Sequence, residues 1–270
     1  MESGKTRRLR RIFRPSGRTV IIPMDHGVSV GPIDGLSDMS LIVSQVRTGG
    51  ADAVLIHSGI ARTVDTSGLG LVLHLSGAIK LTTEPNWKAQ LSTVEQAIHL
   101  GADAVSVHIN VGSEHEQQMV RDFSRIIDDC DRFGLPLLAM MYPRGPNVRS
   151  ETDPEMVSHA ARLGYELGAD IVKTNYSGSR ESFRRVVEAV KVPLVVAGGP
   201  RTSDENGMLR MVYDSMQAGA SGVSIGRYVF QHSDPAAITR AIVKIVHDGA
   251  TPETAGSLLG ERNETVLARA

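Results

Sequence analysis

Four stretches of the sequence repeat one phrase that decides the fold: GGADAVLIHSG (49–59), GADAVSVHIN (101–110), GADIVKTNYSG (168–178) and GASGVSIGRY (219–228). In each, Gly-Ala closes a helix and a run of β-forming residues follows at once. Glycine adopts the left-handed conformation that ends helices, and valine and isoleucine favour strands. Gly50 and Gly101 lie 51 residues apart, as do Gly168 and Gly219. This distance is about twice a strand–helix unit, so it predicts one unmarked strand between the members of each pair.

The unmarked strands are found by working outward from these copies. They are RTVIIPMD (18–25), LVLHLSG (71–77), LPLLAMMY (135–142) and VPLVVAGG (192–199). Segments 92–100 and 181–190 have helical spacing between strands. Near-continuous apolar strands indicate a parallel sheet covered on both faces. Eight of them alternating with helices predict an α/β fold, a single-domain (β/α)8 TIM barrel with eight parallel strands. A doubly wound open sheet is the alternative, but no G-x-G-x-x-G follows the first strand.

Composition restricts the class of protein. The chain has 270 residues, 41% hydrophobic, and a formal net charge of −1, which argues against a nucleic-acid or membrane-surface binder. No apolar run reaches the roughly 18 residues of a membrane helix. The single cysteine, Cys130, excludes an internal disulfide framework and is typical of a reducing cytoplasm, where we place the protein.

The ends of the chain differ from the barrel. KTRRLRRIFR (5–14) could be a targeting sequence or a nucleic-acid patch, but a short capping helix with Leu9, Ile12 and Phe13 turned inward is the favoured interpretation. We therefore divide the chain into a basic N-terminal capping segment (1–17), the barrel (18–250) and a C-terminal tail or helix (251–270).

Polar residues gather at the predicted strand ends, where the active sites of TIM barrels lie. The residues at these ends, with the glycines of the last two turns, are Asp25, His26, His57, Ser58, Ser76, His108, Asn110, Tyr142, Lys173, Gly198, Gly199, Gly226 and Arg227. A purely structural barrel does not require this distribution, so it favours a functional site.

Glycine-bearing turns follow the last strands. The glycines of AGGPR (197–201) and SIGRY (224–228) let backbone N–H groups approach a phosphate. The guanidinium of Arg227 adds a positive charge with several N–H donors. SGS (177–179) offers further donors. These glycines could instead serve only tight turns. Two such loops at the usual phosphate-binding end of a barrel favour a phosphorylated substrate.

Lys173 places one cation in an otherwise apolar strand, IVKTNY (171–176). Burial disfavours the ammonium, and a neutral amine is a nucleophile that can form a Schiff base with a phosphoketone. Lys173 could instead pair with a carboxylate or with the phosphate. Tyr142 and Asp25 end other strands and are candidate proton shuttles, although such residues are often only hydrogen-bonding scaffolds.

At these residues the sequence resembles a known family. PMDHGVSVGPIDGL (23–36), GADAVSVHINVGS (101–113), MMYPRG (140–145), GADIVKTNYSG (168–178), VVAGGP (195–200) and IGRYVFQH (225–232) are similar to the archaeal-type class I aldolases of the DeoC/LacD-like superfamily. Within it, the chain most resembles the 2-amino-3,7-dideoxy-D-threo-hept-6-ulosonate synthases and the related 2-amino-4,5-dihydroxy-6-oxo-7-(phosphonooxy)heptanoate synthases. The resemblance runs from about Arg11 to His247.

The resemblance implies a role for each matched residue. Lys173 matches the Schiff-base lysine, Tyr142 the acid/base tyrosine and Asp25 the active-site aspartate. The matched phosphate-binding positions are Ser177, Gly178, Gly199, Gly226 and Arg227, with Gly198 in the same turn. His26 is expected to help bind substrate.

The implied reaction is an aldolase or transaldolase step without a cofactor. A ketose-phosphate enamine, from dihydroxyacetone phosphate or a deoxyketohexose phosphate, condenses with L-aspartate 4-semialdehyde to a seven-carbon amino keto acid. A class I fructose-1,6-bisphosphate aldolase is the alternative. Those enzymes typically carry Glu-His-Gly-Pro where this chain has Val-Ser-Val-Gly-Pro (28–32). The resemblance also implies a homo-oligomer, in some members a decamer.

Two other classes of protein compete with this interpretation. A metal-dependent aldolase could use His26, His57, His74 and His108, because imidazoles at strand ends can hold zinc. They lie on four separate strands without a local pair, so we predict no metal site. A non-catalytic phosphometabolite-binding barrel would keep the glycine turns but has no use for Lys173.

Overall fold

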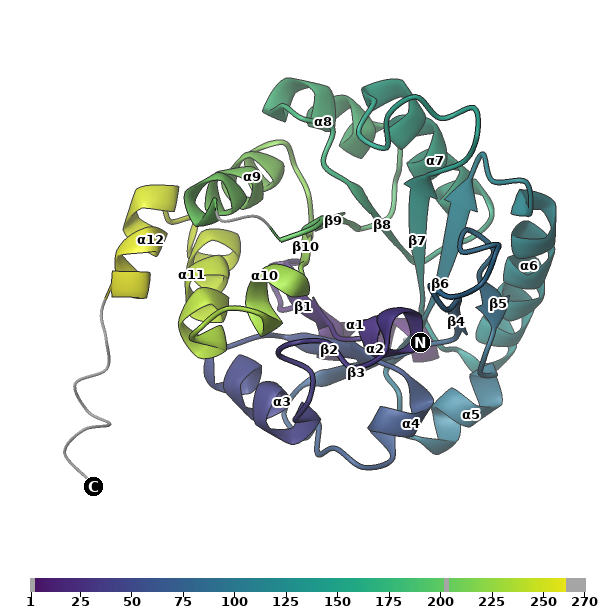
Figure 1. Ribbon diagram of the computed structural model, residues 1–270, viewed down its shortest axis with the longest axis horizontal. Helices are drawn as coiled ribbons and strands as arrows, with labels where there is room; N and C mark the ends of the chain where they lie inside the picture. The colour runs from purple at the N-terminus through teal and green to yellow at the C-terminus, as the bar shows by residue number, and fades with distance from the viewer. Residues whose placement is uncertain (1–2, 202–203, 261–270) are drawn as a thin grey trace.

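Eight parallel strands close into a barrel in the computed structural model, which describes residues 3–201 and 204–260 (Figure 1). Around the ring they are β1 (Thr19–Pro23), β2 (Ala53–Ile56), β3 (Gly70–His74), β6 (Ala104–Val111), β7 (Leu137–Pro143), β8 (Ile171–Asn175), β9 (Leu194–Ala197) and β10 (Gly222–Ser224). Pairing of β10 with β1 completes the ring. The predicted (β/α)8 barrel is confirmed, and the open doubly wound sheet is excluded.

Most helices form a ring outside the strands (Figure 1). The helices of the described residues are α1 (Gly4–Ile12), α2 (His26–Val30), α3 (Met39–Thr48), α4 (Ser58–Ala61), α5 (Val94–His99), α6 (Glu116–Phe133), α7 (Pro154–Glu166), α8 (Arg180–Glu188), α9 (Glu205–Gln217), α10 (Arg227–Phe230), α11 (Pro235–Asp248) and α12 (Pro252–Gly260). The glycine of each repeated phrase has positive φ, from 75° at Gly101 to 104° at Gly168. Glycine adopts this conformation without strain, so the phrase ends each helix and starts the next strand.

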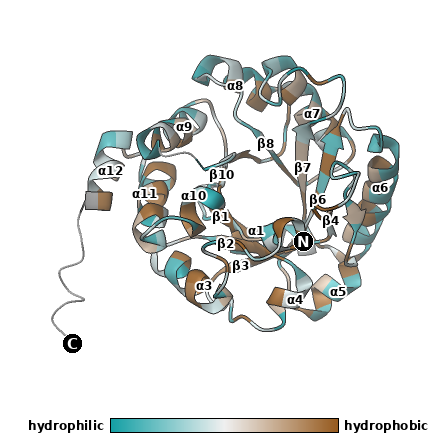
Figure 2. Ribbon diagram, in the orientation of Figure 1, coloured by the Kyte–Doolittle hydropathy of each residue, from teal (hydrophilic) through white to brown (hydrophobic). Residues whose placement is uncertain are grey.

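Side chains along each strand alternate between two apolar layers. In β7, Leu138, Met140 and Tyr142 face the barrel interior. Leu137, Ala139 and Met141 face the helices. This period of two is the geometry of an extended chain. The strands are therefore hydrophobic on both sides, and hydrophobic residues colour long parts of several strands brown in Figure 2. A polar residue on the interior side is an exception.

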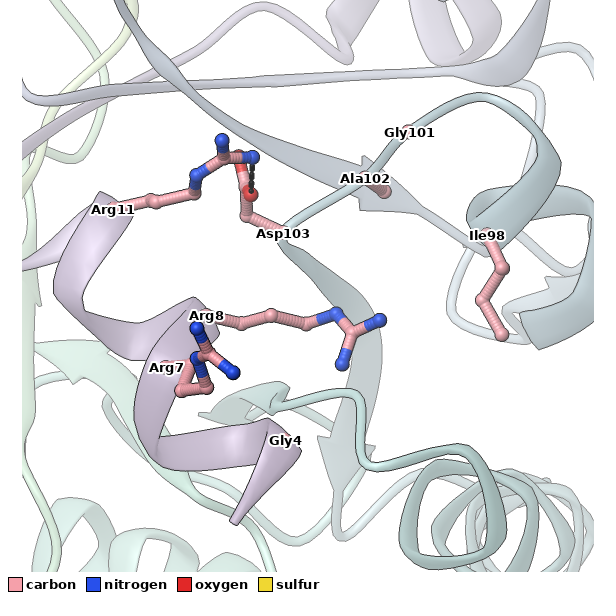
Figure 3. A pocket seen from close by; sticks show the side chains of 8 residues that line it. All are labelled: Gly4, Arg7, Arg8, Arg11, Ile98, Gly101, Ala102 and Asp103. Atoms are coloured by element: carbon pink, nitrogen blue, oxygen red, sulfur yellow. Dashed lines mark hydrogen bonds and ion pairs between the residues drawn. The ribbon is translucent and has the colours of Figure 1, made fainter. Parts of the chain in front are cut away.

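The amino end of the barrel, which we call the floor, is covered by α1. Ile12 is fully buried in the interior cluster, with Leu9 and Phe13 packed against it. The basic residues of this segment contact the aspartates of the repeated Gly-Ala-Asp phrase. Lys5 Nζ lies 2.9 Å from Asp170 Oδ2, Arg11 Nη1 3.0 Å from Asp103 Oδ1 (Figure 3) and Arg14 Nε 2.6 Å from Asp52 Oδ1.

Each of these aspartates also ties two strands together. Asp52 accepts the N–H of Val20, Asp103 that of Leu71 and Asp170 that of Leu137, at 2.7–3.0 Å. In every case the donor lies at the start of the neighbouring strand. The repeated aspartate therefore has a structural role at the floor, and the basic N-terminal segment supplies its counter-charges.

A small antiparallel hairpin interrupts the alternation after β3. It pairs β4 (Ser76–Gly77) with β5 (Ala89–Gln90). The sequence predicts one strand over 71–77, but the barrel strand ends at His74 and the next residues turn into this separate sheet. The physical reason is the register of the sheet, because the pairing of β3 with β6 begins at Val72 and ends at His74. The hairpin connection, residues 78–88, becomes part of the active-site region.

The C-terminal part of the described chain is α12, which packs on α9 and α11 outside the ring (Figure 1). The rest of the predicted tail, residues 261–270, lies outside the described residues, as do residues 1–2. Within the described ranges, no helix has the length and apolarity needed to cross a membrane.

Candidate active site

The alternation along the strands places Lys173 and Asp25 inside the barrel. Ile171 faces the interior, so Lys173, two residues later, does so as well. Ile21 faces the interior, and Asp25 follows four residues later on the same side. Lys173 is only 5% exposed and pairs in register with Met140 of β7. Both charged groups therefore point into the carboxyl end of the barrel, which we call the mouth.

A cavity of about 490 Å³ occupies the mouth. It is lined by the three predicted catalytic residues, Asp25, Tyr142 and Lys173. His26, Gly198, Gly199, Gly226 and Arg227 line it as well. Eight of the ten predicted site residues thus meet in one cavity, although they come from strands up to about two hundred positions apart in the chain.

Ser177 and Gly178 are the two predicted site residues that do not line this cavity. The Ser177 hydroxyl lies 2.8 Å from that of Ser182, within the capping network of α8. Ser177 therefore helps to begin a helix in this structure. Gly178 has a φ of 92°, and the space beside its Cα is open.

The environment of Lys173 favours its neutral form. Burial lowers the pKa of Lys173 from 10.5 to about 8; Asp25 opposes this shift and Arg227 adds to it. Within the described residues, the ion-pair partners of Asp25 are His26 and His74, at 3.6 and 3.8 Å, and Lys173 has no carboxylate within that range. At pH 7 roughly a tenth of the lysine is a free amine, against well under a thousandth at its ordinary pKa.

Asp25 is surrounded by groups that stabilise its carboxylate. Burial opposes ionisation, but His74, His26 and Lys173 hold the pKa of Asp25 below its ordinary value. The pKa of His74 itself is lowered to about 4, mainly by burial, so its ring is neutral near pH 7. His74 Nδ1 lies 2.7 Å from the Ser106 hydroxyl, which fixes the ring. Asp25 is therefore an anionic base that lies beside the imidazoles of His26 and His74.

Tyr142 has the opposite character. Burial, followed by the nearby Asp25 charge, raises the pKa of its phenol well above 10, so it remains protonated near neutral pH. The ring meets His108 edge-on, with centroids 4.9 Å apart. A protonated phenol and an ionised carboxylate in one cavity form a pair suited to give and take protons.

Three charged residues of the cavity were missed by the sequence analysis: Lys88, Arg144 and Glu151. Arg144 lies two residues after Tyr142, so the strand-end rule could have found it. Lys88 lies in the hairpin connection and Glu151 in the loop after β7. No local pattern distinguishes either of them from surface charges.

The four histidines considered as metal ligands are divided among different contacts. The His57 and His74 rings lie 5.1 Å apart with their planes tilted by 55°, His26 packs edge-on against Phe230, and His108 Nε2 lies 2.8 Å from Asn110 Oδ1. Among the residues with described positions, no three His, Cys, Asp or Glu side chains converge in a way that could hold a metal ion.

The chain matches an aldolase family. The model of the DeoC/LacD family aldolases matches residues 19–232. The chain belongs to this family, as the sequence motifs predict.

Relatives within the family differ in the substrates that their names imply. A 2-amino-3,7-dideoxy-D-threo-hept-6-ulosonate synthase of Halobacterium salinarum is 48% identical over 94% of this chain and 96% of its own length. A 2-amino-4,5-dihydroxy-6-oxo-7-(phosphonooxy)heptanoate synthase of Streptomyces griseus is 40% identical over 87% of this chain and 86% of its own length. An archaeal fructose-1,6-bisphosphate aldolase, solved with its catalytic lysine covalently bound to the carbinolamine intermediate, superposes with a TM-score of 0.85 at 36% identity. That match covers 89% of this chain and 98% of that one.

Proposed function

We propose that this chain is a class I aldolase that joins a ketose-phosphate enamine to L-aspartate 4-semialdehyde, giving a seven-carbon amino keto acid. The observation that carries the proposal is Lys173: an amine buried inside the barrel, with a pKa of about 8, in a cavity that also holds glycine turns and Arg227. A buried neutral amine is the nucleophile that Schiff-base chemistry needs. The barrel of residues 18–250 is its catalytic unit.

The steps follow from the character of each group. With dihydroxyacetone phosphate, Lys173 Nζ attacks the ketone carbon, and loss of water leaves an iminium. Removal of a proton from the neighbouring hydroxymethyl carbon gives an enamine, whose carbon forms the new bond to the aldehyde. The resulting alkoxide takes up a proton, and water releases the product and regenerates the lysine. Asp25 and Tyr142 accept and donate these protons.

The phosphate is held at the glycine turns in this proposal. Gly199 has a φ of 66° and open space beside its Cα, so its backbone can be approached closely. Gly226 lies against the backbone oxygen of Pro23 and leaves no room for a side chain. Arg227, half-buried at the start of α10, supplies the charge. Ser177 and Gly178 remain proposed phosphate donors through their backbone.

A fructose-1,6-bisphosphate aldolase is the alternative within the same chemistry. The 36% identical solved structure favours it, but the heptulosonate synthase shares 48% of its residues with this chain over a similar length. The Val-Ser-Val-Gly-Pro stretch (28–32) also departs from the pattern of the bisphosphate aldolases. The amino keto acid product is therefore preferred.

The test is to trap the Schiff base and then to identify the acceptor. Borohydride reduction in the presence of dihydroxyacetone phosphate, followed by peptide mass mapping, is expected to place the adduct on Lys173. Lys173→Met should carry none. Turnover by the wild-type enzyme without this adduct would reject the mechanism. Product analysis with aspartate semialdehyde and with glyceraldehyde 3-phosphate then decides between the two reactions.

A further inference from the structure

The cavity carries a cation that the proposed chemistry does not use. Lys88 lines the same space as Lys173 and Arg227. It comes from the hairpin connection that follows β3 and lies against α6, where its N–H contacts Met119 Sδ at 3.4 Å. In the ring of eight strands, β3 lies four places from β9 and β6 lies four places from β10, so each pair is on opposite sides of the barrel. Lys88 therefore enters the mouth from the side opposite the glycine turns and Arg227.

The backbone that carries Lys88 is held firmly. The fully buried Asn110 of β6 donates its amide N–H to the Asn86 carbonyl at 2.8 Å. The Trp87 ring stacks on His115, with centroids 5.0 Å apart. Lys88 Nζ itself donates to the Pro85 carbonyl at 2.9 Å. The ammonium is thus positioned by its own loop, which is the preorganisation that a binding group needs.

Lys88 is also not neutralised. Within the described residues, no carboxylate lies within ion-pairing distance of its ammonium. Burial, and then the neighbouring Arg144, lower the pKa of Lys88, and Asp25 opposes this shift. Arg144 already binds Glu151 through two hydrogen bonds of 2.6–2.7 Å. A half-buried cation beside another cation is unfavourable unless an anion completes the site.

We propose that Lys88, assisted by Arg144 Nη1, which makes no hydrogen bond to Glu151, binds the carboxylate of the aldehyde substrate and thereby selects the acceptor. This inference rests on the proposed function. A product formed from dihydroxyacetone phosphate and aspartate semialdehyde has its phosphate on C7, its ketone on C6 and its carboxylate on C1. With C6 attached to Lys173 and the phosphate near Arg227, the carboxylate must extend toward the opposite side of the mouth. Among the described residues that line the cavity, Lys88 is the cation on that side without a carboxylate partner.

The chain offers a matched control for this proposal. Lys80 lies on the same hairpin connection but is exposed and does not line the cavity. Lys88→Met and Lys80→Met are compared on three aldehydes of equal length: aspartate semialdehyde, succinate semialdehyde without the amine, and butanal, in which a methyl replaces the carboxylate. Lys88→Met is expected to raise KM about ten- to hundredfold for both carboxylates and to leave butanal unchanged. Lys80→Met should match the wild type throughout.

Each other outcome overturns the inference in a recognisable way. An equal rise in KM for all three aldehydes shows a structural effect. An unchanged KM for the two carboxylate-bearing aldehydes shows that another group binds the carboxylate. Glyceraldehyde 3-phosphate is assayed as a fourth aldehyde, and a rise in KM confined to it makes the Lys88 side a second phosphate site. Borohydride trapping separates this failure from that of the proposed function: without a dihydroxyacetone phosphate adduct on wild-type Lys173, the function itself fails. With that adduct present, only the Lys88 assignment is at stake.

Discussion

The two ends of the barrel use the same charged residue types for opposite purposes. At the floor, Asp103 receives both a backbone N–H and the Arg11 guanidinium, so its charge is satisfied. At the mouth, Asp25 and Lys173 share a cavity without direct pairing, and Lys88 has no carboxylate partner in the described chain. Paired charges hold strands together, whereas unpaired buried charges have shifted pKa values and can react. Pairing, not residue type, therefore separates the structural charges of the floor from Asp25 and Lys173 at the mouth.

Five substitutions or conditions test this difference. The largest effect is expected for Lys173→Met, which removes the reactive amine. Turnover should fall at least about 10⁴-fold. The free energy of unfolding at pH 7 should rise by roughly 1–3 kcal/mol, because a buried unpaired ammonium is lost. Steady-state assay and chemical denaturation measure the two. Lost stability together with lost turnover would instead indicate a structural lysine.

Asp25→Asn should lower turnover by about 10²–10³-fold through loss of the base. The adduct on Lys173 is still expected to form, because the Asp25 charge raises the pKa of Lys173 and its removal leaves more free amine. Borohydride trapping and turnover assays on the same preparation distinguish the two steps. Full activity in this variant would remove Asp25 from the proposed mechanism.

Asp103→Asn makes the same chemical change at the floor. The carboxylate that accepts from Leu71 and pairs with Arg11 is 5% exposed. Its neutralisation should cost about 1–3 kcal/mol of unfolding free energy while kcat stays within about twofold of the wild type. Thermal melting and assays below the transition check this. A loss of kcat without a loss of stability would break the proposed division between floor and mouth.

The pH dependence should report Lys173. Since its pKa is about 8, kcat/KM is expected to rise about tenfold per pH unit below 8 and to level off above it. Between pH 8 and 10.5 the unfolded chain binds this proton and the folded chain does not, so the unfolding free energy rises with pH in that window. The difference in stability between wild type and Lys173→Met should narrow accordingly. A rise of kcat/KM whose midpoint lies near pH 10.5 would contradict the lowered pKa of Lys173.

The smallest effect is expected for Arg11→Gln. The Arg11 side chain is 72% exposed although its partner Asp103 is buried, so solvent screens the pair. We expect the free energy of unfolding to fall by less than about 1 kcal/mol, with a larger fall at low salt and unchanged turnover. Denaturation at two ionic strengths measures it. A cost as large as that of Asp103→Asn would mean that the ion pair, rather than the strand N–H, dominates at the floor.

Most of the fold could be predicted because its signals are local. The glycine that ends a helix and the apolar run that follows are adjacent in the chain, so the repeated phrase locates the strands directly. The hairpin after β3 was not predicted, because LVLHLSG (71–77) is uniformly strand-like and only the register with β6 ends it at His74. The sequence likewise assigned no role to the aspartate of the repeat, which in the structure joins neighbouring strands.

The sequence by itself determined which strands exist and that Lys173, Asp25 and Tyr142 lie near their carboxyl ends. An apolar run and the glycine that ends the preceding helix depend only on neighbouring residues. The tertiary structure alone decided that Lys88 enters the same cavity, that His74 lies beside Asp25, and that the Ser177 hydroxyl joins the capping network of α8. Those contacts depend on closure of the ring and on the path of its loops. No short-range pattern encodes the resulting distance between residues so far apart in the chain.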